Sequence, residues 1–524
     1  MFTCLQIINR QHLSGFTWLM FFRQTFFLTL IWGLISTTYA DTAKKSVTPF
    51  SHESVVKLAE ALASQPFVEP PSAPESLTSL DYSTYRQINF QQNAAVWGNT
   101  PTRFSVQLFA PGYLFNQLVD IDVVENGKAV PVEINEQSFR VPEPSIAQIL
   151  ADVGKYAGLR LHYPINKDDY QDEFVVFQGA SYFRAVSKGQ SYGISARGLA
   201  IDVAEQHGEE FPLFKRFWIE RPAKGQYAIV VHALLDSKSV TGAYRFGIYP
   251  GASTRMDVTA VLFPRRDLAH IGLAPLTSMF MHGPLVRSKV SDYRPAVHDS
   301  EALAIERNNG EWVWRPLNNP ANLQISAFAD VNPKGFGLIQ RQRKFEGYQD
   351  LEATYQNRPS AWVEPMNDWG QGAVQLVEIP SNAESNDNII AYWRPADVLK
   401  QGEPYEFSYR LTWPNDIRPS AKQARVVRSA AGVKLFTSHQ EVVIDYAGLD
   451  AEQVKDVVVN ASISQGNIVE TIIQTNPETQ GARVFVIFDP DGADMAELRV
   501  QLTQNAKPVA ETWLFRWINR RWLP

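Results

Sequence analysis

Beyond residue 100 the chain is dominated by apolar residues at every second position. Phe104, Val106 and Leu108 alternate with Ser105 and Gln107. Similar short segments are separated by Gly, Pro, Asn and Asp and lie at 226–232, 255–263, 373–379, 390–393 and 404–412. Successive side chains of a strand point to opposite faces of a sheet, so this pattern predicts strands with one buried face. We therefore expect an all-β sandwich or barrel rather than alternating βαβ units.

Helical spacing of apolar residues is limited to two short segments near the N-terminal side. The first covers 51–64 and begins at Ser51, whose hydroxyl is a candidate N-cap. The second runs from 145 to about 156, and we expect Gly158 to end it. Both predicted helices are too short to change the all-β assignment.

The composition changes at 414–424, where Pro414 and Pro419 interrupt the strand pattern among charged residues. Alternation resumes in four segments, at 442–446, 456–463, 483–489 and 498–502. A hundred residues of short strands fits a small immunoglobulin-like β-sandwich. We predict a large β-sandwich domain at 41–413, a linker at 414–424 and an immunoglobulin-like domain at 425–524.

Residues 1–40 have the features of a secretory signal peptide. The apolar run at 25–36 precedes small residues and a candidate cleavage site before Asp41. This run is shorter than the ~20 apolar residues that a membrane-spanning helix needs, although an uncleaved anchor is the alternative interpretation. No second apolar run of spanning length follows. We expect an exported, periplasmic protein with no stable membrane insertion after cleavage.

Charge and cysteine content narrow the function classes. The net charge is −6, and it becomes −8 when cleavage removes Arg10 and Arg23. An acidic chain has no basic excess for a phosphate backbone, so nucleic acid is not an expected partner. The single cysteine, Cys4, excludes a disulfide framework and a thiolate zinc site. No nucleotide-binding, serine-hydrolase or zinc-protease motif is present, and no metal or organic cofactor is indicated.

Short runs rich in aromatic residues, arginine and carboxylates fill the region from 179 to 393. They include GASYFR, YGISARGLAID, TGAYRF, APLTSMF, HDS, WRPLNNP, GFGLIQR, RPSAWVEP and DNIIAYW. Aromatic rings stack on the apolar faces of sugars, while polar side chains bond the hydroxyl groups, so a cleft lined in this way suits an oligosaccharide. The alternative is that the aromatic residues fill a sandwich core and the arginine pairs fasten loops.

In these motifs the sequence resembles the periplasmic glucan biosynthesis protein G/D family (OpgG and OpgD, also called MdoG and MdoD). The resemblance runs from about Phe50 to the C-terminus and is densest between Tyr82 and Trp413. The D type typically carries twin arginines in its signal, and their absence here favours the G type. The resemblance implies a large galactose mutarotase-like β-sandwich followed by a small immunoglobulin-like domain.

The resemblance also implies a role in making osmoregulated periplasmic glucans, which have a β-1,2-linked glucose backbone. Members of the family act as inverting endo-β-1,2-glucanases, and their two catalytic aspartates match Asp387, as general acid, and Asp299, as general base. The implied partners are β-1,2-glucan and the inner-membrane glucan synthase. Competing interpretations are a non-catalytic glucan-binding or scaffold protein that assists this synthase and, by fold analogy alone, a mutarotase or epimerase.

The local sequence around the two aspartates is compatible with this chemistry. Inverting glycosidases use two carboxyl groups about 6.5–9.5 Å apart, one to protonate the leaving oxygen and one to activate water. Asp387 lies where a polar loop enters an apolar strand, and Glu384 could orient it or raise its pKa. Asp299 lies between His298 and Ser300, and Ser300 could relay a proton. The alternatives are an Asx turn at Asp387 and a helix cap at Asp299, ahead of the helix-like EALAI.

Further residues complete the predicted substrate-binding set, which already includes Glu384, His298 and Ser300. Candidate stacking residues are Trp312, Trp314, Tyr355, Trp362 and Trp393. Candidate arginines for hydroxyl or carboxylate contacts are Arg184, Arg197, Arg315, Arg341 and Arg358. For each of them, a role in the core or in a loop-fastening ion pair is the alternative.

Overall fold

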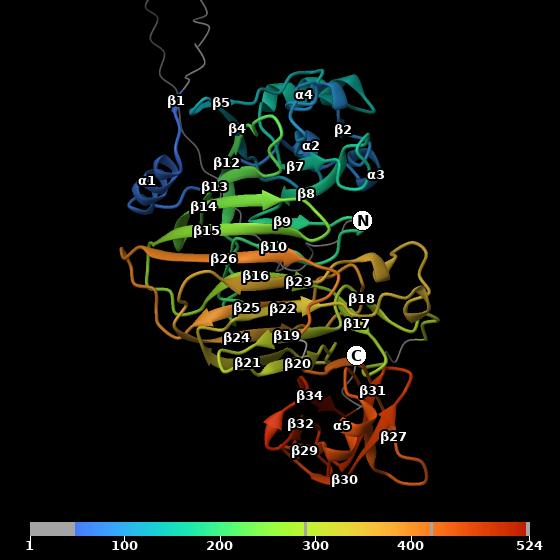
Figure 1. Ribbon diagram of the computed structural model, residues 1–524. Helices are drawn as coiled ribbons and strands as arrows, with labels where there is room; N and C mark the ends of the chain where they lie inside the picture. The colour runs from blue at the N-terminus through green and yellow to red at the C-terminus, as the bar shows by residue number, and fades with distance from the viewer. Residues whose placement is uncertain (1–47, 288–290, 420–422, 520–524) are drawn as a thin grey trace, which may run out of the picture.

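The computed structural model describes residues 48–287, 291–419 and 423–519 (Figure 1). The predicted signal peptide lies outside these residues. The described chain is built almost entirely from antiparallel strands, which confirms the all-β prediction. Among the described residues, no helix has the length and apolar character needed to cross a membrane.

The largest sheet of the described chain has 16 strands and runs the length of the molecule. Its strands, in spatial order, are β1 (Thr48–Pro49), β5 (Lys128–Pro131), β4 (Asp120–Glu125), β12 (Leu213–Glu220), β13 (Ile229–Asp236), β14 (Val240–Tyr249), β15 (Thr254–Pro264), β26 (Tyr405–Trp413), β23 (Ala361–Pro365), β22 (Gly335–Ile339), β19 (Ala302–Glu306), β20 (Trp312–Pro316), β34 (Thr512–Ile518), β32 (Met495–Gln504) and β29 (Val458–Ile463), with β33 (Lys507–Pro508) paired to β32.

A second sheet of 10 strands faces part of the first. It contains β21 (Gln324–Val331), β24 (Gln371–Glu378), β25 (Ile389–Pro395), β16 (Ile271–Ser278), β10 (Ser195–Arg197), β9 (Tyr182–Ala185), β8 (Asp172–Gln178), β7 (Gly158–Tyr163) and β3 (Ser105–Phe109), with β11 (Leu199–Ile201) paired to β16. Two short pairs complete the large part of the molecule, namely β17 (Phe280–His282) with β18 (Val297–His298), and β2 (Asn89–Phe90) with β6 (Phe139–Arg140).

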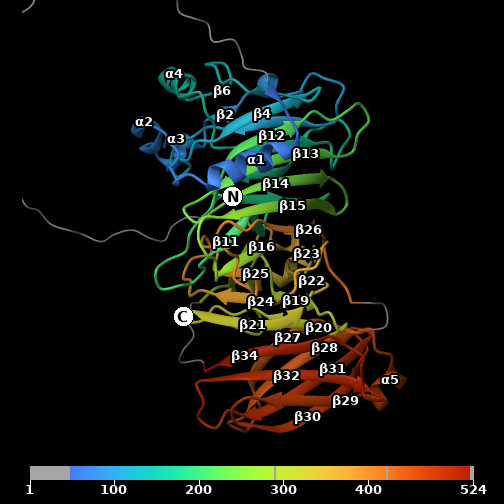
Figure 2. The ribbon, with the colours of Figure 1, turned by 90° about the vertical axis from the view of Figure 1, so that its left-hand side faces the viewer.

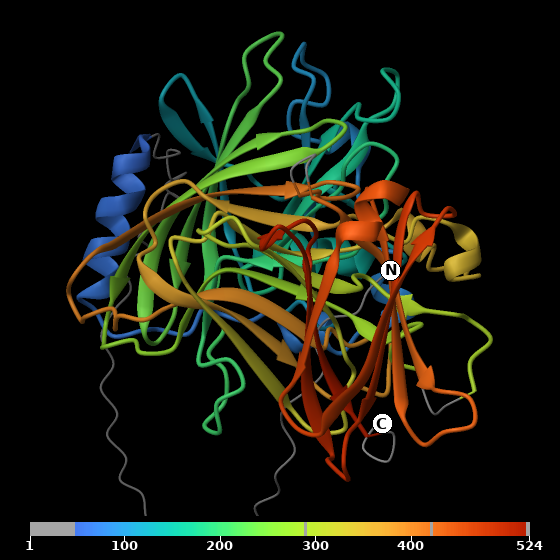
Figure 3. The same cartoon turned by 60° about the horizontal axis from the view of Figure 1, so that its bottom comes forward.

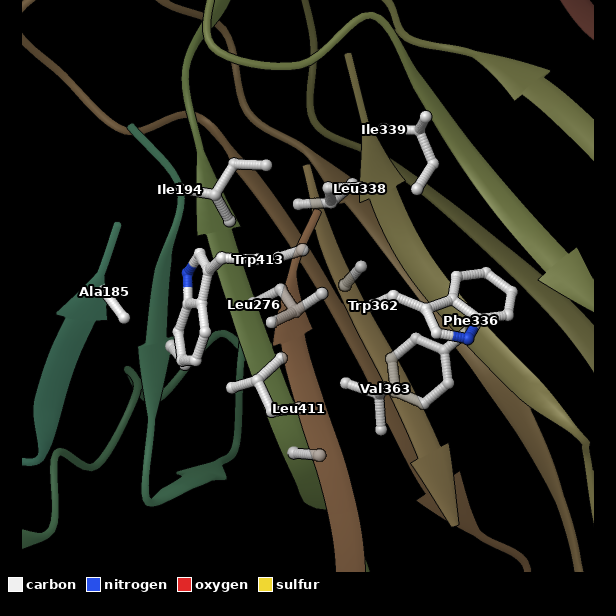
Figure 4. Close-up of a cluster of buried hydrophobic side chains, with 14 of the residues drawn as sticks. Ala185, Ile194, Leu276, Phe336, Leu338, Ile339, Trp362, Val363, Leu411 and Trp413 are labelled. Carbon is white, nitrogen blue, oxygen red and sulfur yellow. The ribbon is translucent and has the colours of Figure 1, made fainter. Parts of the chain in front are cut away.

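Aromatic side chains from the inner faces of the two sheets fill the space between them. Phe177 of β8 lies with its ring centroid 5.2 Å from that of Phe246 of β14, and Phe183 of β9 lies 5.3 Å from Phe246. Figure 4 shows a neighbouring region of the same core, in which Trp362, Phe336 and Val363 are enclosed between the strands. The period-two pattern therefore produces a face-to-face sandwich, because apolar residues of both sheets point toward a shared interior.

The predicted first helix is confirmed as α1 (His52–Ala63), with the hydroxyl of Ser51 accepting a hydrogen bond from the backbone of Ser54. It lies across β13, β14 and β15, on the side of the sheet that Figure 2 turns toward the viewer. Val55 and Ala59 are buried there against Trp218 and Ala243. Because α1 covers the outer face of these strands, β14 is buried on both faces, and its sequence is apolar rather than alternating.

The second predicted helix forms as α4 (Pro144–Val153), but it ends earlier than expected. Gly154 has φ +62° and closes the helix in the left-handed conformation, which glycine adopts without steric cost. Gly158 instead begins β7. The remaining helices are short, namely α2 (Glu75–Thr78), α3 (Tyr82–Tyr85), α5 (Ala451–Asp456) and the 3₁₀ turns η1 (Gln92–Ala94), η2 (Phe345–Gly347) and η3 (Tyr355–Asn357).

The C-terminal part begins at β27, and the eleven residues between the end of β26 and its start are those where the linker was predicted. Its own sheet contains β27 (Arg425–Val433), β28 (Gln440–Ala447), β31 (Gly481–Asp489) and β30 (Asn467–Asn476). This sheet packs against β34, where the rings of Phe488 and Trp517 lie 5.9 Å apart. Figure 3 shows these strands in orange and red. The immunoglobulin-like assignment and the domain boundaries stay predictions.

The two parts are joined more closely than the sequence suggests. Strand β34 pairs in parallel with β20, so that Val313 lies opposite Thr512 and Trp314 opposite Trp513. The large sheet therefore continues into the C-terminal part instead of ending at the linker.

Candidate functional site

Asp299 follows β18 and is buried, with 5% of its surface exposed. Its carboxylate accepts a hydrogen bond from Arg358 Nη1. Burial alone would lower the pKa of Arg358, but the charges of Asp299, Tyr355 and Glu384 outweigh this effect and raise it. Asp299 is thus held as one half of an enclosed ion pair. The segment after it forms strand β19, so the alternative of a cap on a helix at EALAI is wrong.

Asp387 is half-buried in the loop that joins β24 to β25, one residue before Asn388. The side chain of Asn388 fastens this loop, since its Oδ1 accepts from Phe280 N at 2.8 Å and its Nδ2 donates to the carbonyl of Ile379 at 3.1 Å. These bonds fix the backbone next to Asp387 at the end of a buried strand, as the local sequence predicts.

A single segment, Ser278–Phe280, holds both aspartate-bearing segments. The carbonyl of Ser278 accepts from Asn388 N at 3.0 Å, and the carbonyl of Met279 accepts from Asp299 N at 2.8 Å. Asp299 and Asn388, which are 89 positions apart in sequence, are therefore attached to adjacent peptide units. The segment connects β16 to β17, so the C-terminal end of β16, an interior strand of the 10-stranded sheet, brings the two aspartate-bearing segments to one region.

Tyr355 and Glu384 connect the two sides of this region. The Tyr355 hydroxyl donates to Glu384 Oε2 at 3.0 Å, and its ring lies 4.4 Å from the guanidinium of Arg358. Burial raises the pKa of Tyr355 far above its usual value, so the hydroxyl keeps its proton. Arg358 also donates through Nε and Nη2 to the carbonyl of Ala353, at 3.3 Å each.

Sequence reasoning did not select Arg294, which lies at the centre of this network. Its Nη1 donates to Glu384 Oε2 at 2.8 Å and to Asp350 Oδ2 at 2.9 Å. Its Nε and Nη2 donate to the carboxylate of Asp292. The partners Asp350 and Glu384 are 56 and 90 residues away in sequence, so no local motif relates them to Arg294.

A cavity of about 410 Å³ opens beside these charged groups. Arg294, Asp292 and Glu384 line it, together with His282 and Asn319. Its size and its mixture of hydrogen-bonding groups suit one or a few sugar rings. The loop that carries Asp387 forms part of its wall, because Ser381–Ser385 belong to the lining.

A larger cavity of about 580 Å³ lies over β7, β8 and β9. Aromatic side chains such as Tyr85, Tyr182 and Tyr192 line it, with Arg184 and Arg160 among the polar residues. Arg184, one of the predicted substrate contacts, thus faces a cavity rather than the core. Figure 1 shows α3, β17 and β18 along the same side of the molecule.

The rim of the larger cavity touches the segment that holds Asp299. Ser191, which lines the cavity, donates its backbone N–H to the carbonyl of Asn357 at 3.0 Å. A Cβ atom at Gly193 would lie 2.9 Å from Cβ of Arg358, so only glycine permits this close approach. The segment 191–193 therefore lies between the larger cavity and the Arg358–Asp299 pair.

The two residues that flank Asp299 are enclosed. His298 stacks on Phe280 with ring centroids 5.4 Å apart, and burial lowers its pKa to about 3, so the ring is neutral at neutral pH. Ser300 lies fully buried, and its hydroxyl shares a hydrogen bond with Ser278 at 2.7 Å. His298 and Ser300 therefore pack on either side of Asp299 in the chain, and neither lines the cavity beside Arg294.

The structure does not bring the predicted tryptophans to this region. Trp312 and Trp362 stack on each other with centroids 5.4 Å apart and are buried. Trp393 has no exposed surface, and the ring of Trp314 is covered by the guanidinium of Arg341 at 3.8 Å. These four rings fill the core, because the strands that carry them are buried on both faces, and this leaves no ring face for a sugar.

Three of the predicted arginines form ion pairs away from the aspartates. Arg315 pairs with the buried Glu378 at 3.2 Å, and Arg341 pairs with Glu511 at 2.6 Å. Arg197 is paired with Glu209 and lies between the rings of Tyr182 and Phe211. Of the predicted supporting residues, the structure thus gathers only Tyr355, Arg358, Glu384, His298 and Ser300 around Asp299 and the Asp387 loop.

The fold and the site define an all-β protein whose enclosed carboxylates adjoin cavities lined with polar and aromatic residues. The model of the family described as "Periplasmic glucan biosynthesis protein, MdoG" matches residues 50–517. The chain belongs to this family, and it is a periplasmic glucan biosynthesis protein of the G type.

The relatives support this assignment over nearly the whole chain. "Glucans biosynthesis protein G 2" of Shewanella oneidensis is 61% identical over 91% of this chain and 90% of its own length. "Glucans biosynthesis protein G" of Vibrio cholerae is 47% identical over 89% of this chain and 87% of its own length. The protein of that name from Bradyrhizobium diazoefficiens is also 47% identical, over 91% and 95%.

Solved structures give only remote likenesses. A galactose mutarotase related enzyme from Lactobacillus acidophilus matches 57% of this chain and all of its own, at 9% identity and a TM-score of 0.21. A polysaccharide lyase matches 69% of this chain and 44% of its own, at 11% identity and a TM-score of 0.19. Scores this low carry no argument about the function.

Proposed function

We propose that this protein acts on the glucan backbone as an inverting endo-β-1,2-glucanase, with Asp387 as general acid and Asp299 as general base. The observation that carries the proposal is the shared anchor at Ser278–Phe280, which fastens both aspartate-bearing segments to neighbouring peptide units. Two carboxyl groups that flank one bond are what inversion by a single displacement requires.

In this mechanism Asp387 donates its proton to the glycosidic oxygen as the bond between that oxygen and the anomeric carbon breaks. A water molecule attacks the same carbon from the opposite face, and its proton passes to Asp299. The new hydroxyl therefore has the inverted, α configuration. Arg358 stabilises the negative charge that Asp299 needs in order to accept the proton, and Tyr355 holds Glu384 beside the acid.

The two cavities support an oligosaccharide as the substrate. The smaller cavity, beside Glu384, would hold the sugar rings next to the cleaved bond. The larger one, across Ser191 and Gly193, would hold further glucose units of the same chain, with Tyr182 and Arg184 as ring and hydroxyl contacts. Binding on both sides favours cleavage within a chain rather than at its end.

The test is incubation of the mature protein, starting at Asp41, with linear β-1,2-glucan. Products are separated by chromatography, and the configuration at the new end is read by proton NMR. We expect shorter glucans with α ends from the wild type and from the control Asp168→Asn, whose side chain is 94% exposed. Asp387→Asn and Asp299→Asn should fold normally and release no product. Equal product from Asp387→Asn would overturn its role as the acid.

A second candidate function is glucan binding without turnover, in support of the inner-membrane glucan synthase. One observation favours it: Arg358 covers the carboxylate of Asp299, which is 5% exposed, so water has little access to the proposed base. This function predicts retarded migration of the protein in a glucan-containing gel, together with no product after long incubation.

A further inference from the structure

The side chain of Arg294 contacts both arms of the network. One arm is the loop that carries Asp387, which Arg294 reaches through Glu384 at 2.8 Å. The other is the segment 350–358, which it reaches through Asp350 at 2.9 Å. The same nitrogen, Nη1, makes both contacts, so a displacement of one arm displaces the other.

The second arm leads directly to Asp299. Asp350 Oδ1 accepts the backbone N–H groups of Glu352 and Ala353, at 2.9 and 2.7 Å. The carbonyl of Ala353 in turn accepts two hydrogen bonds from Arg358, whose remaining nitrogen binds Asp299. The position of Arg358, and therefore that of Asp299, depends on the turn that Asp350 and Arg294 hold.

The guanidinium is itself fixed before any substrate is present. Asp292 binds its Nε and Nη2 and also accepts the backbone N–H of Arg294 at 2.9 Å. The hydrogen bonds that Arg294 donates to Asp292 raise the pKa of Arg294 above its usual value, so the guanidinium is always charged. A planar, always-charged group with several fixed donors can hold several carboxylates at set angles, which a lysine cannot do.

The charges around Arg294 do not balance without it. Asp292, Asp350 and Glu384 face it, and the other groups within reach are Arg287 and His282 in the cavity wall and Arg358 beyond Tyr355. His282 Nε2 lies 3.1 Å from the carbonyl of Arg294. Removal of the guanidinium would leave three carboxylates close together near the loop of Asp387.

We propose that Arg294 is a positioning residue that sets the placement of the general acid relative to the general base and compensates the negative charge around the acid. This inference rests on the proposed glucanase function. It assigns to Arg294 no contact with the reacting atoms.

The test compares Arg294→Met and Arg294→Lys with the wild type on linear β-1,2-glucan. The matched control is Arg307→Met, since Arg307 also joins two carboxylates, Glu311 and Asp330, but in a hairpin away from the site. We expect Arg294→Met to lower kcat by about 100-fold, the size of effect that a misplacement of about 1 Å produces. We expect KM to stay within about threefold, because the donors of the guanidinium are already engaged by Asp292, Asp350 and Glu384 and do not depend on substrate.

The pH profile separates positioning from a general loss of structure. With three uncompensated carboxylates, Arg294→Met should move the basic limb of the kcat profile to higher pH, because negative neighbours keep an acid protonated. Arg294→Lys keeps the charge, so it should keep the wild-type limb and still lose rate. The double variant Arg294→Met/Glu384→Gln should move the limb back toward the wild type.

An unchanged kcat and pH profile in Arg294→Met, or a rise in KM alone, would overturn the inference. If the wild type releases no product, the glucanase proposal fails, but Arg294 can still be judged. Carboxyl NMR of aspartate-labelled protein, with Asp387→Asn to identify the signal, should then show the Asp387 titration moved upward in Arg294→Met by about half a pH unit or more. The same titration in both proteins would refute the role.

Discussion

At the scale of single residues, the ion pair of Asp299 with Arg358 limits the access of water to the proposed base. A general base must be reached by water, whereas Asp299 is 5% exposed and its carboxylate is covered by a guanidinium. An enclosed ion pair contributes little net stability, but the loss of one partner is costly, because the other charge is left without compensation.

We therefore expect Arg358→Met to lower the free energy of unfolding by about 1–3 kcal/mol, the cost of an unsatisfied buried polar group. The measurement is urea unfolding at pH 7. The double variant Asp299→Asn/Arg358→Met should recover part of the loss, since it removes the uncompensated charge. Additive losses in the double variant would show that the pair is not coupled.

The sequence motifs selected the residues at the centre of the proposed site but not those that hold them in place. Asp299, Asp387, Glu384 and Tyr355 lie in short polar runs, which is why a local pattern could select them. Arg294 makes its contacts across 56 and 90 residues, and no spacing in the chain encodes such a contact. The four predicted tryptophans lie in the core instead. Composition alone cannot distinguish a ring that fills a core from a ring that faces a sugar.

At the scale of elements, α1 is fastened to the large sheet by a pair of histidines. His52 of α1 and His232 of β13 have their Nδ1 atoms 3.0 Å apart, and His232 Nε2 lies 2.7 Å from Glu220 Oε1. Burial, followed by the charges of His232 and Arg245, lowers the pKa of His52 to about 4, against the opposing effect of Glu220. A single proton fits between the two Nδ1 atoms, so the contact cannot hold both rings in their charged form.

This contact predicts a pH dependence of stability. The pKa of His52 is about 6.5 in the unfolded chain and lower in the folded one, so the unfolded state binds the proton more readily. The stabilisation is complete above pH 6.5 and is lost as the pH falls toward 4. We expect Tm to fall less between pH 7 and pH 4.5 in His52→Asn than in the wild type.

His207→Asn is the control for this experiment, because the His207 side chain is 67% exposed. It should follow the wild-type curve. Parallel curves for all three proteins would mean that α1 is held by its apolar face alone, through Val55 and Ala59.

At the scale of the whole molecule, buried charges join the C-terminal part to the large sandwich. Arg341 extends from the end of β22, donates to both carboxylate oxygens of Glu511 at 2.8 and 2.6 Å, and covers the ring of Trp314. Glu511 also accepts the backbone N–H of Val426, the second residue of β27. One carboxylate thus ties β22 and β27 to the start of β34.

We expect Glu511→Gln to destabilise the protein by about 3–5 kcal/mol, the cost of breaking a buried ion pair. Urea unfolding followed by tryptophan fluorescence measures it. The control is Glu452→Gln, whose surface pair with Lys455 should contribute less than about 1 kcal/mol. A loss in Glu511→Gln no larger than in the control would mean that the junction depends on the β20–β34 strand pairing instead.

The sequence by itself determined the fold class, the placement of several strands, the first helix and the family, because periodicity and motifs are local properties of the chain. It misplaced the end of α4. It also described EALAI as helix-like, whereas this segment forms β19 and pairs with β20 on one side and β22 on the other. Only the tertiary structure decided that the large sheet continues through β34, that four predicted tryptophans lie in the core, and that Arg294 joins the arms of the site. Each of these depends on contacts between distant segments, which form only when the sheets have packed.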